Sequence, residues 1–311
     1  MRLLVTGAGG FVGAAVARAA ASGGHDVFGT VRPGGNPSRA EQTGATVVPL
    51  DLHDKPQVAA ALANIRPDIL IHSAWGNVTA HRQANQGAAT ADIDAACTLV
   101  TAGVAAGLKR FVGIGSQAEY GLRDKPDNRA AVSEQHLPEP RSLYGAAKLA
   151  ALALTRQLCA EGAISFAWLR LFATYGPSDN SAWLIPSLID QILAGKVPRT
   201  SAGVQRCDYL YIEDAAEAVI AAAIRPDATG VFNLGSGSAL RVRDIVEAIR
   251  DLVAPGHPID FGAVPYGSNQ VWHLQADISQ LCQATGWAPA TDFQTGLSRT
   301  VGWHRERRVH A

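Results

Sequence analysis

Cysteine is scarce in this chain of 311 residues, and the few that occur lie far apart. They are Cys97, Cys159, Cys207 and Cys282. Neither a CxxC pair nor a cluster of cysteine with histidine occurs, which disfavours both a disulfide framework and a metal site. Isolated thiols are typical of a reducing compartment, so a cytoplasmic location is expected.

Net charge and long apolar runs are missing as well. The 27 basic residues balance the 27 acidic ones. The sequence shows no basic stripe, and a nucleic-acid partner is therefore not expected. No run of 18 apolar residues occurs, which predicts no membrane span. The first apolar run breaks at Gly7 and is too short for a secretory signal.

What the chain does have is 47% hydrophobic content, enough for a large core. In the first half, short apolar segments alternate with alanine-rich helical stretches. Strands are expected at 3–6, 26–31, 46–50, 69–73, 110–115 and 166–172, and helices at 10–22, 55–63, 89–107 and 143–161. This alternation predicts an α/β fold with a doubly wound parallel sheet that is covered on both faces.

The first expected strand runs directly into a glycine-rich turn, with Gly7, Gly10 and Gly13 three residues apart and Phe11 and Val12 between them. Glycine is needed where the chain reverses, where backbone approaches a pyrophosphate and where helix packs on strand. The free amides at the start of the helix favour an anion. The turn therefore predicts a Rossmann-type dinucleotide site. An ordinary tight turn is the alternative.

The end of the second strand bears on which dinucleotide binds. An acidic residue for the ribose of NAD is expected near Val31, but Arg32 follows instead. An arginine there suits a 2′-phosphate. The sequence therefore favours NADP(H), with NAD(H) as the other possibility and a solvated surface arginine as the alternative to both.

A tyrosine and a lysine on one helical face form the second motif. Tyr144 and Lys148 lie four residues apart in the helix expected at 143–161. A neighbouring ammonium stabilises a phenolate and should lower the pKa of the tyrosine, making it a usable acid or base. The alternative is a surface pair. Ser116 follows the fifth strand, at the sheet edge where open α/β folds bind ligands, and its hydroxyl could orient a substrate oxygen.

The second half of the chain is less regular after Tyr175-Gly176-Pro177. Helices are expected at 184–193, 214–224 and 242–253, whereas 262–275 looks extended and loop-rich. We expect residues 1–175 to form the dinucleotide-binding domain with the Ser/Tyr/Lys set. Residues 176–311 should form a smaller mixed α/β region, mainly for substrate, from which segments such as 206–235 return to the first domain.

Taken together, these motifs resemble the extended short-chain dehydrogenase/reductase superfamily, in its nucleotide-sugar epimerase/dehydratase/reductase branch. The resemblance covers nearly the whole chain. Besides the motifs above, it includes Asp51-Leu52, Ile71-His72-Ser73-Ala74, Tyr120-Gly121, Arg170-Leu171-Phe172, Arg206-Cys207-Asp208-Tyr209, Phe232-Asn233-Leu234-Gly235 and Gly286-Trp287.

The resemblance implies a role for each matching residue. Tyr144 would be the acid/base, Lys148 its pKa modulator and a ligand of the nicotinamide ribose, and Ser116 the polarising hydroxyl. The other implied cofactor ligands are Asp51 and Leu52 at the adenine, Ser73, Ala74 and Trp75 after the fourth strand, and Phe172 at the nicotinamide. The implied substrate ligands are Ser116, Gln117, Tyr144 and Arg206, of which Arg206 would contact the diphosphate. A homodimer through helices 89–107 and 143–161 is also implied.

Departures from the family pattern narrow the chemistry. Dehydratases of this branch carry acidic residues directly after the serine or threonine, but here Gln117 and Ala118 follow Ser116. An amide and a methyl group cannot act as general acid and base, so dehydration is disfavoured. Ala173 stands where many epimerases have asparagine. An arginine of a late Tyr-Arg-Pro pattern is lost in the segment ending at Ser268.

The leading hypothesis is therefore an NADP(H)-dependent reductase of a nucleotide-activated keto-sugar of the 4-keto-6-deoxyhexose type, with Tyr144 as proton donor. The first alternative is a nucleotide-sugar epimerase, in which the same residues carry a transient oxidation. The second is a non-catalytic NADP-binding regulator on this fold.

Overall fold

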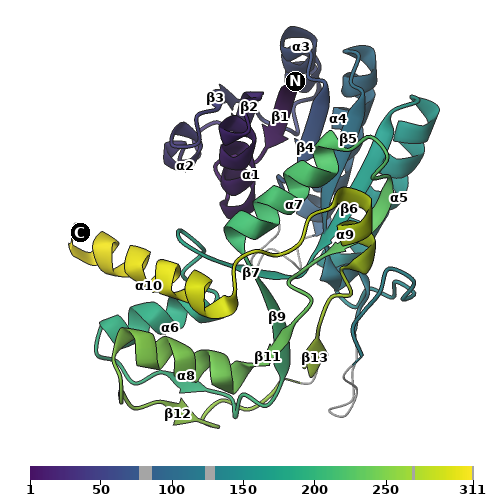
Figure 1. Ribbon diagram of the computed structural model, residues 1–311. Coiled ribbons are helices and arrows are strands. Elements are labelled where there is room, and N and C mark those ends of the chain that lie inside the picture. The colour runs from purple at the N-terminus through teal and green to yellow at the C-terminus, as the bar shows by residue number, and fades with distance from the viewer. Residues whose placement is uncertain (77–85, 123–129, 268–269, 310–311) are drawn as a thin grey trace.

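A seven-stranded parallel sheet forms the larger part of the protein (Figure 1). The structure is a computed structural model, and it describes residues 1–76, 86–122, 130–267 and 270–309. The sheet order is β10-β6-β5-β4-β1-β2-β3. The bounds are β1 (Arg2–Thr6), β2 (Asp26–Val31), β3 (Thr46–Pro49), β4 (Ile69–His72), β5 (Arg110–Ser116), β6 (Ser165–Leu171) and β10 (Gly230–Leu234). The predicted doubly wound parallel sheet is confirmed.

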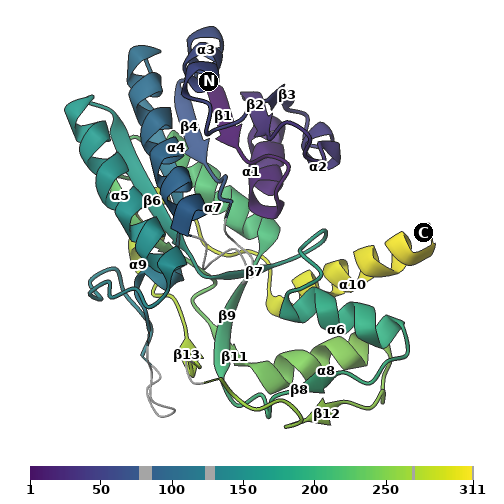
Figure 2. The same cartoon turned by 180° about the vertical axis from the view of Figure 1, so that it is seen from behind.

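Helices cover both faces of this sheet (Figure 2). One face carries α1 (Phe11–Ser22) and α7 (Ile212–Ile224), and the other carries α3 (Lys55–Ile65), α4 (Gln86–Ala105) and α5 (Leu143–Glu161). Every residue of β4 and β5 is buried for this reason. Near-continuous apolar strands are what such a sheet requires. A short helix, α2 (Ser38–Glu41), follows β2.

Helix α4 is the one described helix that is long and apolar enough to cross a membrane by length and composition alone. It packs between α3 and α5, and its residues Ala96, Leu99 and Val100 are fully buried in the core on that side of the sheet. Its apolar character is therefore accounted for by its place in the core.

A smaller sheet lies below the large one in Figure 1, at the carboxyl end of its strands. Its strands are β7 (Ala173–Tyr175), β9 (Arg206–Tyr211), β11 (Ala239–Arg241) and β13 (His273–Leu274), and each of the others pairs with β9. The pair β8 (Arg199–Thr200) and β12 (Asp260–Phe261) lies apart. The remaining helices are α6 (Leu184–Leu193), α8 (Val242–Val253), α9 (Ser279–Thr285) and α10 (Phe293–Val309).

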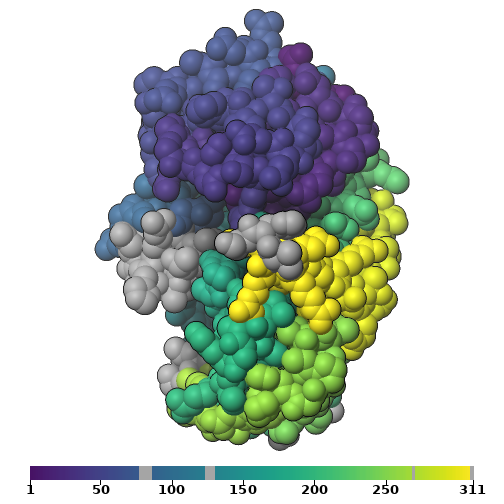
Figure 3. Space-filling model, turned by 90° about the vertical axis from the view of Figure 1, so that its left-hand side faces the viewer, coloured from purple at the N-terminus to yellow at the C-terminus, as the bar shows by residue number. Residues whose placement is uncertain are grey.

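The chain after Tyr175 contributes to both parts of the molecule. Strand β9 lies in the smaller sheet, but α7 follows it directly and packs on α1, and β10 then pairs with β6 at the edge of the large sheet. Figure 3 shows the N-terminal residues, in purple and blue, above the C-terminal residues, in green and yellow. The chain then passes to β11 in the smaller sheet and, after β13, returns to pack α9 on α7 and β10, so repeated crossings hold the two parts together.

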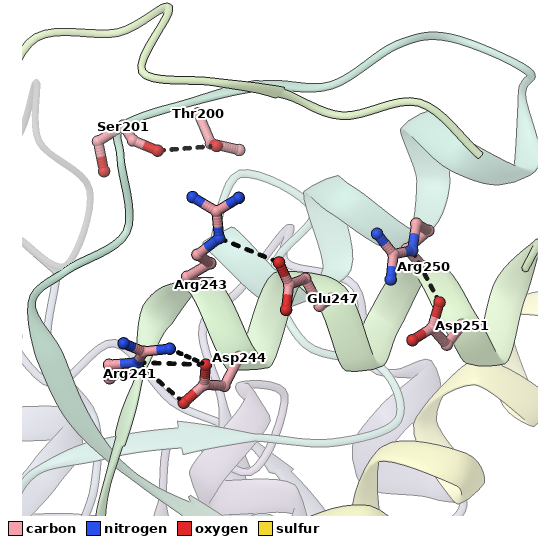
Figure 4. A network of polar contacts seen from close by, with 8 residues as sticks. All are labelled: Thr200, Ser201, Arg241, Arg243, Asp244, Glu247, Arg250 and Asp251. Carbon is pink, nitrogen blue, oxygen red and sulfur yellow. Dashed lines mark hydrogen bonds and ion pairs between the residues drawn. The ribbon is translucent and has the colours of Figure 1, made fainter. Parts of the chain in front are cut away.

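Helix α8 shows how the smaller region separates its apolar and charged residues. Val242, Ile245, Val246 and Ile249 face the core. The opposite face carries ion pairs along the helix, which Figure 4 shows as Arg241–Asp244, Arg243–Glu247 and Arg250–Asp251. The side chains of these pairs are partly or largely exposed, so this face of the helix contacts solvent. Such exposed pairs contribute little to stability.

Trp168 of β6 is the largest fully buried side chain among the described residues. A Cβ atom added to Gly113 or Gly115 of β5 would overlap its ring. We expect Trp168→Ala to lower the free energy of unfolding by about 3 to 5 kcal/mol, as the loss of a large core aromatic does. Trp183→Ala, at a tryptophan that is 49% exposed, should change it by less than about 0.5 kcal/mol. Urea denaturation of both variants decides this, and equal midpoints would contradict the prediction.

Candidate active site

The glycine-rich turn lies where β1 ends, at the carboxyl edge of the large sheet. Gly7 has φ +73°, and a Cβ atom there would come within 2.8 Å of the Cα of Ala74, which follows β4. A Cβ atom on Gly13 would overlap the carbonyl of Gly7. The turn therefore excludes side chains at two points, which brings the start of α1 close to the ends of β1 and β4.

The first turn of α1 fits a pyrophosphate group. Its N-cap, Gly10, has extended backbone and supplies no side-chain hydrogen bond to the helix amides. Phe11 and Val12 form the start of the helix and are half-buried. Uncapped amides at a helix N-terminus that no side chain covers are the group that binds dinucleotide phosphates.

The ends of β2 and β3 are neighbours, since these strands pair in parallel. Arg32 is exposed directly after β2, and within the described part of the chain no carboxylate forms an ion pair with it. Asp51 is half-exposed, and its Oδ1 accepts the amide of His53 at 3.0 Å. Leu52 packs against the core on the α3 side. The three residues predicted at the adenosine end thus follow adjacent strands.

The segment after β4 is hydrogen-bonded to Thr6 at the end of β1. The amide of Ala74 donates to Oγ1 of Thr6 at 3.2 Å, and the same oxygen lies 2.9 Å from Nδ1 of His72. Burial lowers the pKa of His72 to about 3, and the charge of Lys148 adds to this effect. His72 is therefore neutral and packed in the core. Ser73 is half-buried beside it.

Ser116 ends β5, and its backbone and side chain are both fixed by the residues that follow. Its Oγ accepts the amide of Ala118 at 3.1 Å, and its own amide donates to Oε1 of Glu119 at 2.9 Å. These bonds form a capping box on the short 3-10 helix Gln117–Glu119. The half-buried Gln117 is the first residue of that helix, so it lies beside Ser116.

Tyr144 reaches Ser116 because α5 begins against this short helix. A Cβ atom on Gly145 would overlap the carbonyl of Ala118, and Ser142 caps α5 by accepting the amide of Gly145. Burial raises the pKa of Tyr144 to about 12, although a hydrogen bond with Ser116 acts in the opposite direction.

The expectation of a lowered pKa for Tyr144 is therefore wrong in this structure, where the pKa is raised. The phenol is desolvated, and desolvation outweighs the other influences on it. Nζ of Lys148 donates to the carbonyl of Ile114 at 2.7 Å and lies 4.0 Å from the ring centroid of Trp75. Tyr144 is protonated at neutral pH, which suits it to donate a proton.

Lys148 is almost fully buried. Burial lowers its pKa to about 8, while the carboxylates of Glu119 and Asp92 oppose that shift. The structure thus brings Ser116, Tyr144, Lys148 and Trp75 together at the ends of β4 and β5. A proton donor, an orienting hydroxyl and a titratable cation are the groups that carbonyl chemistry needs.

Glu119 is the nearest carboxylate in sequence to Ser116, but it is not available for acid/base chemistry. It is fully buried, and it accepts from Nε1 of Trp168 at 3.0 Å and from Nε of Arg170 at 2.8 Å. A buried carboxylate with three donors serves the structure of this turn. The sequence alone did not show this role, because both partners come from β6.

Two predicted ligands lie outside the Ser116–Tyr144–Lys148 cluster. Phe172 is buried between β6 and β7, where it packs with Tyr120 and Ala276. Arg206 begins β9 in the smaller sheet and donates to the carbonyl of Ala239 at 3.0 Å. Gly267, which stands at the place of the arginine in the late Tyr-Arg-Pro pattern, belongs to the described residues, whereas Ser268 after it lies outside them.

Asp92 is a polar residue that the sequence reasoning did not select. It lies on α4 and is 7% exposed, and its Oδ2 accepts the amide of Gly76 at 3.0 Å. No sequence signal marks it, because it is one of several polar residues in an alanine-rich helix.

The chain is similar in sequence to known enzymes. A model of the NAD dependent epimerase/dehydratase family matches residues 3–235. A UDP-glucose 4-epimerase of Corynebacterium glutamicum is 29% identical over 320 residues, covering 95% of this chain and 93% of that protein. A dTDP-glucose 4,6-dehydratase of Streptomyces griseus is 27% identical over 215 residues, covering 68% of this chain and 63% of that protein.

A solved structure, that of MoeE5 in complex with UDP-glucose and NAD, is similar over nearly the full length. It superposes with a TM-score of 0.82 at 27% identity and covers 99% of this chain and 100% of that one. The described fold therefore agrees with that of a solved nucleotide-sugar complex over nearly the whole chain.

The burial of Lys148 has a measurable cost in stability. Its pKa is lower in the folded state than its ordinary value of 10.5, so the unfolded chain binds the proton more tightly. The cost is fully present below pH 8 and disappears as the pH rises through 10.5. We expect Lys148→Met to raise the free energy of unfolding at pH 7 by on the order of 2 kcal/mol, and this gain to shrink between pH 8 and pH 10.

The control is Lys109→Met, at a lysine whose side chain is 76% exposed. It should leave stability within about 0.5 kcal/mol of the wild type at every pH. Urea denaturation from pH 7 to pH 10 measures both variants. A pH-independent difference between the wild type and Lys148→Met would show that the buried charge is not its source.

Proposed function

This chain belongs to the NAD dependent epimerase/dehydratase family, and from that membership we propose that it reduces the carbonyl of a nucleotide-activated keto-sugar. It is an NAD(P)-dependent enzyme of the extended short-chain dehydrogenase/reductase type. The observation that carries the proposal is Tyr144, a buried phenol beside Ser116 whose raised pKa keeps it protonated. A group that holds its proton at neutral pH is suited to protonate an alkoxide.

Ser116, Tyr144 and Lys148 each have a separate role in the proposed reduction. The dinucleotide, when bound at the Gly7–Gly13 turn, supplies the hydride. Ser116 orients the substrate carbonyl through its hydroxyl, and Tyr144 gives its proton to the carbonyl oxygen as the alkoxide forms. Lys148 stabilises the phenolate that remains, and a proton from solvent restores Tyr144. The reaction consumes one dinucleotide and one proton for each carbonyl reduced.

A nucleotide-sugar substrate is supported by the relatives. MoeE5 was solved with UDP-glucose and NAD, and the other two relatives are named for UDP-glucose and dTDP-glucose. Gln117 lies beside Ser116 and would contact the sugar, and Arg206 would contact the diphosphate. We propose a 4-keto-6-deoxy sugar as the substrate. Dehydration is not the proposed reaction, because Gln117 and Ala118 replace the acids of a dehydratase and Glu119 is held by Arg170.

Epimerisation is the second candidate. The relative from Corynebacterium glutamicum, similar over nearly its whole length, is a UDP-glucose 4-epimerase. In that reaction Tyr144 would first accept the proton of a sugar hydroxyl and later return it. A non-catalytic regulator is not favoured, because the structure gathers Ser116, Tyr144 and Lys148 at one sheet edge.

The reductase proposal predicts net consumption of the dinucleotide. Purified protein with a 4-keto-6-deoxy nucleotide sugar should oxidise one NADPH for each product formed. Tyr144→Phe should lower kcat by about 10²- to 10⁴-fold, the contribution of a positioned proton donor, while dinucleotide binding is kept. Tyr175→Phe, which removes a buried hydroxyl that donates to the carbonyl of Phe293, should keep the activity.

Two results would change this assignment. Interconversion of two nucleotide sugars without net oxidation of the dinucleotide would favour the epimerase. Full activity in Tyr144→Phe would reject Tyr144 as proton donor in either reaction.

The preference for NADP(H) is part of the proposal. Arg32 is exposed at the end of β2, and Val31 stands where an acid for the ribose of NAD is expected. Charge-assisted hydrogen bonds to a phosphate are among the stronger ones. Since MoeE5 was solved with NAD, binding of both dinucleotides has to be measured.

Arg32→Ala should weaken NADPH binding by about tenfold and leave NADH binding within about twofold, as loss of one charge-assisted bond predicts. Arg18→Ala, at an exposed arginine on α1, should change neither. Titration of each variant with both dinucleotides by calorimetry decides the point. Equal losses for the two dinucleotides would remove Arg32 from the 2′-phosphate site.

A homodimer through α4 and α5 is the assembly we propose. The two helices pack side by side on one face of the sheet. Their outer surfaces carry Val104, which is 40% exposed, and Leu154, which is 49% exposed. Exposed apolar side chains on adjacent helices support an interface there.

A further inference from the structure

Trp75 lies against both members of the Tyr144–Lys148 pair. The Nζ atom of Lys148 is 4.0 Å from the centroid of its ring, and the ring of Tyr144 meets it edge-on at 6.4 Å with an interplanar angle of 86°. Its Nε1 is buried and has no hydrogen-bond partner among the residues that the structure describes. The indole is therefore not held in place by a hydrogen bond of its own.

The backbone beside Trp75 is fixed instead from α4. The next residue, Gly76, donates its amide to Oδ2 of Asp92 at 3.0 Å. A Cβ atom on Gly76 would lie 3.2 Å from Oδ1 of the same carboxylate, so the contact is close. Nε2 of His53 lies 3.5 Å from Oδ1. Asp92 thus fixes the backbone of Gly76, the residue next to Trp75.

The aromatic ring of Trp75 matters for Lys148 because this lysine is a buried cation without a direct carboxylate partner in the described part of the chain. One of its three N–H groups donates to Ile114. Glu119 is committed to Arg170 and Asp92 to Gly76, so both carboxylates act on Lys148 only through their fields. An aromatic face over a desolvated ammonium stabilises the charged form.

We propose that Trp75 is a positioning residue for Lys148, holding the ammonium charged beside Tyr144, and that Asp92 keeps Trp75 in place through the amide of Gly76. The inference rests on the proposed function in so far as Tyr144 and Lys148 carry the chemistry. The contact itself is a property of the protein alone and is tested without substrate.

The groups that face Lys148 come from several elements. Tyr144 lies on its own helix α5, Glu119 lies after β5, and Asp92 lies on α4. His72 on β4 is neutral at the pH of interest, since burial lowers its pKa to about 3. The carboxylates favour the charged lysine and burial disfavours it, so removing the aromatic face moves the balance toward the neutral amine.

Fluorescence tests the contact directly. The emission of Trp75, obtained as wild type minus Trp75→Phe, should change with a midpoint near pH 8, because the ammonium on the ring face is lost there. Lys148→Met should abolish that transition. Emission that does not titrate, or that titrates equally in Lys148→Met, would overturn the contact between Trp75 and Lys148.

The role of the contact is tested by the pH profile of kcat/KM. In Trp75→Leu the high-pH limb should move down by about one pH unit, a tenfold change in the protonation of Lys148 that corresponds to about 1.4 kcal/mol. Trp75→Phe keeps an aromatic face and should keep the limb within about 0.3 units of the wild type. A limb in Trp75→Leu at the wild-type position would overturn the positioning role.

Asp92 is tested by a matched pair of variants. Asn in place of Asp92 still accepts the amide of Gly76, whereas Leu does not. Asp92→Asn should therefore keep the pH-dependent Trp75 emission, with its midpoint at lower pH because the carboxylate charge is removed, and Asp92→Leu should lose it. Unchanged emission in Asp92→Leu would reject the role of Asp92. If the wild type reduces no nucleotide sugar, the proposed function fails, but the emission of Trp75 still decides the contact.

Discussion

Covering both faces of the seven-stranded sheet with helices leaves the strand ends as the places where polar side chains can meet a ligand. Strands β4 and β5 are buried along their whole length. Several candidate groups accordingly lie where a strand ends: the glycine turn after β1, Arg32 after β2, Trp75 after β4 and Ser116 at the end of β5. Tyr144 and Lys148 join them because α5 starts against the turn that follows β5.

The same burial decides the protonation of the site. Desolvation raises the pKa of Tyr144 to about 12 and lowers that of Lys148 to about 8. A protonated phenol and a cation close to its titration point therefore lie side by side. The nearby carboxylates are each committed elsewhere, Glu119 to Arg170 and Asp92 to Gly76. Besides the carbonyl of Ile114, the ring face of Trp75 lies directly against the ammonium, which gives this bulky residue a physical purpose.

Most of the large sheet could be predicted from the sequence, because its strands are apolar and its helices are long. The bounds expected for β2, α5, α6 and α8 match those of the structure. Strands β7, β9 and β10 were not predicted as strands. They are short or mix polar with apolar residues, and their pairing depends on β6 and on one another, which no local pattern encodes. Helix α7 and β10, which lie in the segment 206–235 that was expected to return to the first domain, reach the large sheet through contacts far apart in sequence.

The sequence by itself determined the parallel α/β fold, the glycine turn and the spacing of Tyr144 and Lys148, because each depends on residues close together in the chain. Only the tertiary structure decided how the groups behave. Glu119 is hydrogen-bonded to Trp168 and Arg170 of β6, and Asp92 accepts the amide of Gly76 after β4. Tyr144 is protonated, although the motif alone predicts a lowered pKa. The reason is that burial and hydrogen-bond partners are set by chain segments far apart in sequence, and these outweigh the effect of one neighbouring charge.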